Sequence, residues 1–206
     1  TSMPNKFHGL SAHSELTINH SALKTLATDL LKIANDIRFL ASGPRAGYGE
    51  LRIPANEPGS SIMPGKVNPT QAEALTMAAV RVMGNDTTIT VAASQGNFEL
   101  NVMLPMIAHN LLNSIQLLAN VSRLLADKAI ATFKVNEARL QEALDKNPIL
   151  VTALNPVVGY LKAAEIAKTA YKEKRPIVEV AAEKTDLGEA QLRKLLDPKK
   201  LTEGGL

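Results

Sequence analysis

Residues 11–41 read SAHSELTINHSALKTLATDLLKIANDIRFLA and contain the pattern that decides the fold. Their apolar side chains recur mostly at alternating steps of three and four residues, which places them along one side of a helix. The series consists of Leu16, Leu23, Leu26, Leu30, Ile33, Ile37 and Leu40. It predicts a helix of roughly thirty residues, far longer than the average helix of a globular protein.

Two further runs with the same spacing lie farther along the chain. One begins after Pro69 and reaches Ile89, and the other extends from Leu104 to Leu125. Aromatic residues make up only 3% of the sequence, so the many Ala and Leu side chains allow long helices to pack closely. Three such helices carry more apolar surface than they can bury among themselves, and we therefore expect an oligomer.

The later part of the chain has shorter helical patterns. Four segments are predicted to be helical, with Pro148, Pro156, Pro176 and Pro198 next to them, namely 135–145, 157–173, 177–185 and 189–196. The expected fold class is all-α, a long-helix bundle plus a small C-terminal helical domain. We place the bundle segment at 1–132, with a loop at 42–68, and the small domain at 133–206.

Composition and charge exclude several classes of protein. Lys and Arg total 23 and Asp and Glu total 20, and the net charge of +3 is too small to indicate a nucleic-acid or membrane-surface partner. No apolar run in the sequence is long enough to span a bilayer. The sequence contains no Cys, which removes disulfides and thiolate metal sites. The four His residues remain as the only good nitrogen ligands for a metal.

Polar residues inside the helical runs have a structural explanation. The four His residues show neither metal-ligand spacing nor a Ser–His partnership, and each is expected to be a helix-surface residue or a satisfied core residue. Asn85 and Asp86 interrupt the second run, and Asn110 and Asn113 flank the third. We expect these groups to fix helix register or subunit orientation rather than to catalyse a reaction.

The loop at 42–68 contains five Gly and four Pro, and a connection of this length in a helical protein is usually functional or disordered. Gly59 and Gly65 permit backbone conformations closed to other residues. Asn68 and Pro69 match a helix start, with Asn68 as N-cap and Pro69 at the first helical position. Lys66 beside that positive helix end predicts a site for a small carboxylate or phosphate. The same residue types are equally common in loops and helix starts that bind nothing.

The segment GSSIMPGKVNPTQAEALTM at 59–77 resembles the signature loop of the fumarase/aspartase superfamily, and most closely that of class II fumarases. The resemblance extends to KIANDIRFLASGPRAGYGEL at 32–51, NEPGSS at 56–61, VMGND at 82–86, GNFELNV at 96–102, and LVTALNPVVGY with KAAEIAKTAY at 150–171. It implies that the chain is the later part of such an enzyme, less than half of its length, and carries part of the central helical bundle of the superfamily.

The resemblance also implies a reaction and roles for individual residues. Class II fumarases hydrate fumarate reversibly to L-malate without a metal or an organic cofactor. Ser60 corresponds to the catalytic base, and the substrate carboxylates are held by Ser61, Lys66 and Asn68. Glu73 resembles a residue that supports activity, either by pairing with Lys66 or by ordering the loop. The catalytic acid of the family, a His next to a Thr, belongs to the earlier part of such enzymes, so we expect the chain alone to be inactive.

In this family four subunits pool their long helices in a homotetramer, which fits the surplus of apolar surface. The resemblance implies an enzyme of the tricarboxylic acid cycle, located in the cytoplasm or, in a eukaryote, in the mitochondrial matrix. Two alternatives remain open. One is an aspartate ammonia-lyase, which shares the GSSIMPGKVNP core, and the other is a non-catalytic helical assembly module.

Overall fold

The computed structural model describes residues 2–43, 45–59 and 62–203 of the chain. Contacts between residues divide it after Val135 into two compact units. Helices dominate both units, which confirms the all-α prediction. Within the described ranges the only strands are β1 (Leu51–Arg52) and β2 (Lys134–Val135), which pair antiparallel in the first unit.

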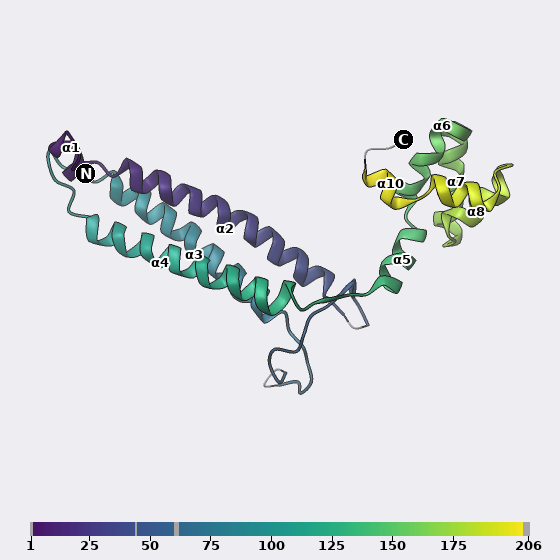
Figure 1. The fold of residues 1–206 in the computed structure, drawn as a ribbon, viewed down its shortest axis with the longest axis horizontal. Helices are drawn as coiled ribbons and strands as arrows, with labels where there is room; N and C mark the ends of the chain where they lie inside the picture. The colour runs from purple at the N-terminus through teal and green to yellow at the C-terminus, as the bar shows by residue number, and fades with distance from the viewer. Residues whose placement is uncertain (1, 44, 60–61, 204–206) are drawn as a thin grey trace. The chain divides into compact units, whose positions relative to one another are not determined.

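Three long helices form the first unit. They follow a short α1 (Lys6–Ser11) and comprise α2 (Ser14–Leu40), α3 (Thr70–Ala93) and α4 (Leu104–Leu125). The three lie side by side, and both α2 and α4 pack along α3 (Figure 1). Helix α4 continues directly into η1 (Ala126–Ile130), a turn of π-helix.

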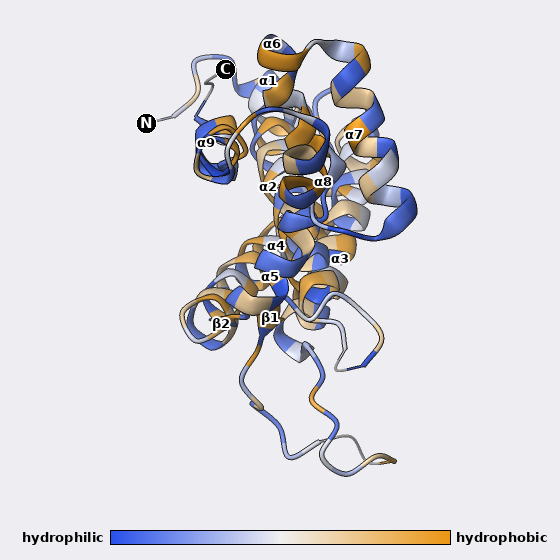
Figure 2. Ribbon diagram, turned by 90° about the vertical axis from the view of Figure 1, so that its right-hand side faces the viewer, coloured by the Kyte–Doolittle hydropathy of each residue, from blue (hydrophilic) through white to orange (hydrophobic). Residues whose placement is uncertain are grey.

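Small residues set the packing of α2 against the other helices. Ala27 and Ala34 are fully buried, and their spacing of seven residues puts them on one face together with Ile37. By contrast, Leu26 and Ile33 keep 45% and 42% of their surface exposed although they belong to the same apolar series. The unit therefore leaves part of that series facing outward, and Figure 2 shows hydrophobic residues recurring along α3 and α4.

A layer of polar side chains interrupts the apolar core of this unit. His20 of α2 has no exposed surface, and its Nδ1 lies 3.0 Å from Asp86 Oδ1 while its Nε2 lies 2.8 Å from Ser114 Oγ. Asn85 Nδ2 donates to the same Ser114 Oγ at 2.9 Å, and Lys24 Nζ donates to Asp86 Oδ2 at 2.5 Å. We call these five residues the polar layer. It connects α2, α3 and α4 with one another.

The pKa of Asp86 reflects two opposing effects. Burial favours the neutral carboxyl and acts to raise the pKa, but hydrogen bonds and charge from Lys24 and His20 outweigh it. The net pKa lies below its ordinary value of 3.8, so the carboxylate stays charged within the bundle.

The second unit has its own apolar core. Its helical segments are α5 (Glu137–Asp145), the 3₁₀ helix η2 (Pro148–Leu154), α6 (Asn155–Val158), α7 (Tyr160–Glu173), α8 (Ile177–Lys184), α9 (Glu189–Leu195) and α10 (Pro198–Thr202). The fully buried Leu154, Ile166, Val180 and Leu192 lie at the centre of its core. In the described part of the chain, no helix of either unit is both long and apolar enough to cross a membrane.

Candidate functional site

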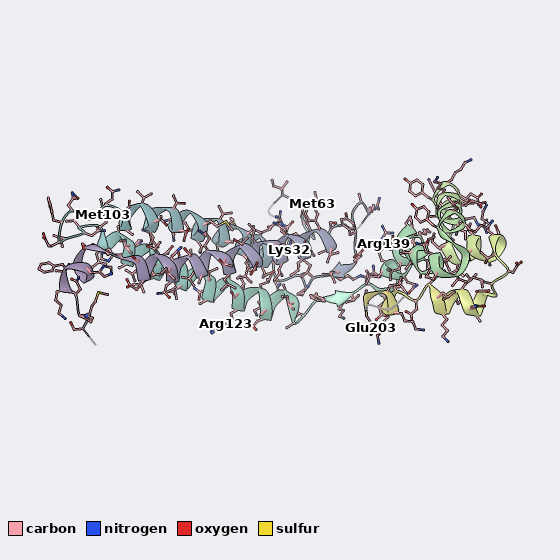
Figure 3. All side chains as sticks on the ribbon, turned by 90° about the horizontal axis from the view of Figure 1, so that it is seen from above. Lys32, Met63, Met103, Arg123, Arg139 and Glu203 are labelled. Carbon is pink, nitrogen blue, oxygen red and sulfur yellow. The ribbon has the colours of Figure 1, made fainter. Side chains whose placement is uncertain are left out.

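The loop that joins α2 to α3 leaves the bundle at one end. Met63 in this loop lies towards the end of the unit opposite Met103, which precedes α4 (Figure 3). The loop backbone is attached to the bundle where it begins, because Glu50 N donates to Leu40 O at 2.9 Å. It is attached again where β1 pairs with β2. The tip of the loop is therefore carried by a fixed stem.

Two glycines form a narrow neck in this loop. Gly59 and Gly65 have φ of +117° and +77°, and Gly59 forms an isolated antiparallel bridge with Pro64. A Cβ on Gly59 would lie 2.8 Å from Gly65 N, closer than real side chains approach a backbone atom. Both glycines thus adopt positive-φ conformations that other residues rarely adopt, and Gly59 needs to be glycine for the close approach as well.

Hydrogen bonds hold the base of the loop. Asn56 Nδ2 donates to Gln71 Oε1 at 3.0 Å and to the backbone carbonyl of Lys128 at 2.9 Å. Glu57 Oε1 accepts from Thr70 Oγ1 at 2.6 Å and from Gln71 Nε2 at 3.1 Å. We call this group of five residues the clamp. It fixes two adjacent loop residues to the first turn of α3 and to η1.

A cavity of about 340 Å³ lies next to the clamp. It is lined by loop residues, namely Ala55, Asn56, Glu57, Pro58, Gly59, Gly65, Lys66 and Val67. The 24-residue helix α3 begins at Thr70, close behind Lys66 in the sequence, and its N-cap residue Pro69 makes no side-chain cap hydrogen bond. A Lys side chain and an uncapped helix start both favour an anion.

The predicted start of this helix is wrong by one position. Helix α3 begins at Thr70 with Pro69 as its N-cap, and Asn68 lies outside the helix. The fixed φ of proline suits either position, −79° being observed here. The consequence is favourable for a binding site, because the Asn68 amide does not cap the helix.

Two protein families match the sequence. The family described as Lyase matches residues 1–84, and the family described as Fumarase C C-terminus matches residues 150–203. The first match includes the whole loop and the start of α3. The chain corresponds to the C-terminal part of class II fumarases.

Individual relatives agree with this relationship. The chain is 68% identical over 184 residues to a class II fumarate hydratase of Pseudomonas aeruginosa, an alignment that covers 89% of this chain and 40% of the relative. It is 57% identical to the class II fumarate hydratase of Xylella fastidiosa, covering 98% of this chain and 43% of that protein. The chain thus spans less than half the length of these curated relatives.

A solved structure shows the same architecture. The crystal structure of the class II fumarase of Schistosoma mansoni matches with a TM-score of 0.89 and 42% sequence identity. The match covers 98% of this chain and 42% of that one. The fold of this chain is therefore that of a part of a class II fumarase.

The structure describes only some of the residues that the fumarase resemblance assigns to the site. Ser60 and Ser61 lie outside the described residues. Lys66 lines the cavity, and Asn68 follows it in the same segment. Glu73 lies in the first turn of α3, where its backbone N–H donates to Pro69 O at 2.9 Å. Its carboxylate forms no ion pair with Lys66, so one of the two roles considered for Glu73 is not seen.

Sequence reasoning missed two groups of polar contacts. His20 is a satisfied core residue, as expected, but its contact with Ser114 joins residues 94 positions apart and has no local signal in the sequence. The clamp was also missed, since Asn56 and Gln71 lack any spacing that marks them as partners. Among the residues that the structure describes, no group of three or more His, Asp or Glu side chains could hold a metal ion.

Proposed function

We propose that the chain supplies the serine loop of a fumarate hydratase, which interconverts fumarate and L-malate. The observation that carries the proposal is Lys66 on the cavity beside the uncapped start of α3. Fumarate is a small dianion, and such a site suits a carboxylate. The identity of 57% and 68% to proteins named class II fumarate hydratase selects this reaction from others that a carboxylate site could serve.

The proposed chemistry needs several groups arranged in advance. In the malate direction a base removes a weakly acidic proton from the carbon next to a carboxylate, and negative charge develops on that carboxylate. We assign the base to Ser60 and the binding of carboxylates to Ser61, Lys66 and Asn68. Glu73 supports the loop from the first turn of α3. The acid that assists the departing hydroxyl group comes from the earlier part of the enzyme, so the chain alone is inactive.

The proposed enzyme is a homotetramer in which long helices of four subunits pack together. Apolar side chains on the bundle helices support this assembly, because they are exposed in the single chain. They include Ile18, Leu26, Ile33, Met77, Val80, Val91, Leu112 and Ile115. Burying such a surface is favourable in water. We place the enzyme in the tricarboxylic acid cycle and in the cytoplasm, or in the mitochondrial matrix of a eukaryote.

Mixing the purified chain with the earlier part of a class II fumarase tests the proposal. We expect loss of fumarate absorbance only in the mixture, and we expect Ser60→Ala to abolish it. Ser94→Ala is the matched control, because Ser94 is an exposed serine that ends α3 far from the loop. Turnover without added ammonia separates hydration from the aspartate ammonia-lyase reaction. Association of the two parts without turnover would contradict the proposal and favour an assembly module.

A further inference from the structure

One side-chain amide joins three separate segments at the base of the loop. Asn56 belongs to the loop, Gln71 to the first turn of α3, and Lys128 to η1, which continues α4. Both bonds made by Asn56 Nδ2 have ordinary hydrogen-bond lengths, at 3.0 Å and 2.9 Å. The loop is thus attached at one point to the start of one bundle helix and to the end of another.

The direction of these hydrogen bonds is fixed from both ends. The carbonyl of Lys128 can only accept, so Asn56 must turn its NH₂ group towards it. The carboxylate of Glu57 accepts from Gln71 Nε2, so Gln71 must turn its oxygen towards Asn56. The Lys128 carbonyl and the Glu57 carboxylate therefore require the same orientation of the two amides. Asp in place of Asn56, or Glu in place of Gln71, would bring two oxygen acceptors together.

The helix end depends on this donor. The backbone N–H groups of Thr132 and Phe133 both bond to the carbonyl of Ala129, at 3.2 Å and 2.9 Å. They leave the preceding carbonyl, that of Lys128, to Asn56. Carbonyls in the last turn of a helix lack partners within the helix and need them from elsewhere. The contact therefore satisfies a carbonyl at the end of η1 and also anchors the loop.

We infer that Asn56 and Gln71 are positioning residues, which hold the Lys66 side of the loop against the start of α3. The inference rests on the proposed function of this loop in binding fumarate. Asn56 itself lines the cavity that Lys66 lines, whereas Gln71 is only 7% exposed and acts through Asn56 and Glu57. Without the clamp the loop samples more conformations, and fewer of them are competent to bind the substrate. The apparent affinity then falls in proportion to the competent fraction.

The test uses Asn56→Asp and Asn56→Ala in the complex of this chain with the earlier part of a class II fumarase. N56D keeps the shape of Asn but replaces the donor NH₂ group with an oxygen, which then faces the oxygen atoms of Gln71 and Lys128. N56A only removes the donor. We expect the KM for fumarate to rise about tenfold or more in N56D and less in N56A, with kcat of the assembled enzyme nearly unchanged. A role limited to stability would instead lower the amount of active enzyme and leave KM unchanged.

Asn101→Ala is the matched control. Asn101 is 2% exposed and donates Nδ2 to Ala92 O at 3.0 Å, beyond the opposite end of α3 from the clamp. It loses amide hydrogen bonds, as the Asn56 variants do, and because Asn101 is buried we expect it to destabilise the bundle at least as much. We expect its KM to equal that of the unchanged chain. A rise in KM for N101A equal to that for N56D would overturn the inference.

Hydrogen exchange of the chain alone gives a readout that does not depend on turnover. The Lys66 amide donates to Met63 O at 3.2 Å and the Glu73 amide to Pro69 O at 2.9 Å, and we expect both to exchange faster in N56D. If amide exchange is faster in N56D but the complex without any substitution is inactive, the proposed function fails while the anchoring stands. The positioning role would be overturned if N56D exchanged no faster than the chain without substitution, or if it exchanged faster but had the same KM.

Discussion

The polar layer and the clamp both lie in the first unit, and they join distant segments with the same kinds of group. Each contains a carboxylate that accepts two hydrogen bonds from side chains, and each contains an amide that bridges two helical segments. They differ in what surrounds them. All members of the polar layer except Lys24 are buried between α2, α3 and α4, whereas Asn56 and Glu57 of the clamp line a cavity. Enclosure agrees with the expected role of the first group in fixing helix register, and access makes the second suitable for positioning a loop that we propose to bind a ligand.

Hydrogen-bond geometry alone does not separate these two roles. Asp86, His20 and Ser114 are bonded in the order found in a Ser–His–Asp catalytic triad. Yet Ser114 and His20 have no exposed surface, and a nucleophile needs a substrate within reach. The comparison teaches that access, rather than the presence of a His and a Ser partner, decides which group is a candidate for catalysis.

The largest expected effect is on the polar layer. Replacing His20 with Ala removes two hydrogen bonds and opens a cavity, and it leaves Asp86 bonded only to Lys24 and Ser114 bonded only to Asn85. We expect a loss of about 3 kcal/mol in the free energy of unfolding. Urea unfolding followed by circular dichroism measures it. His109→Ala on the exposed surface of α4 is the control and should change stability by less than about 0.5 kcal/mol. Equal losses would mean that the polar layer does not hold the helices.

Asp86→Asn should have a smaller effect that depends on pH. The amide oxygen still accepts from His20, while Lys24 is 43% exposed in its side chain and can turn to water, so we expect a loss of about 1–2 kcal/mol at neutral pH. The pKa of Asp86 is lowered in the folded chain. Its carboxylate therefore contributes stability above the ordinary value of 3.8, and this contribution is lost as the pH falls through the folded pKa.

Unfolding of both proteins across this acid range measures the difference between them. We expect the unchanged chain and the Asn variant to converge as the pH falls below 3.8. A difference that stays constant down to the lowest pH would show that the charge of Asp86 does not stabilise the bundle.

Much of the fold could be predicted from the sequence because helix periodicity is a local property. The three long runs correspond to α2, α3 and α4, and prolines lie at several boundaries between the shorter segments of the second unit. The outward position of Leu26 and Ile33 could not be predicted in the same way. Small residues such as Ala27 allow the closest packing between helices, so they take the buried face although Leu and Ile are more apolar.

The site was predictable only in part. The glycine neck and Lys66 belong to one short stretch, where residue types limit the backbone and the charge. The partners of Asn56 lie 15 and 72 positions away, and nothing in the local sequence identifies them. Contacts of this kind follow from the way that α3 and η1 meet, which depends on the packing of the whole unit.

The smallest effect on overall stability is expected in the neck of the loop, where two glycines can be compared. Gly59→Ala places a Cβ 2.8 Å from Gly65 N at φ +117°, whereas Gly65→Ala has φ +77° and meets no atom within 4 Å. Both should lower global stability by less than about 1 kcal/mol, because the neck can open without disturbing the bundle. Only G59A must open it, so its Lys66 amide should exchange faster than that of G65A. Equal exchange in both variants would mean that the close approach at the neck does not hold the loop, and the clamp alone would then remain as its support.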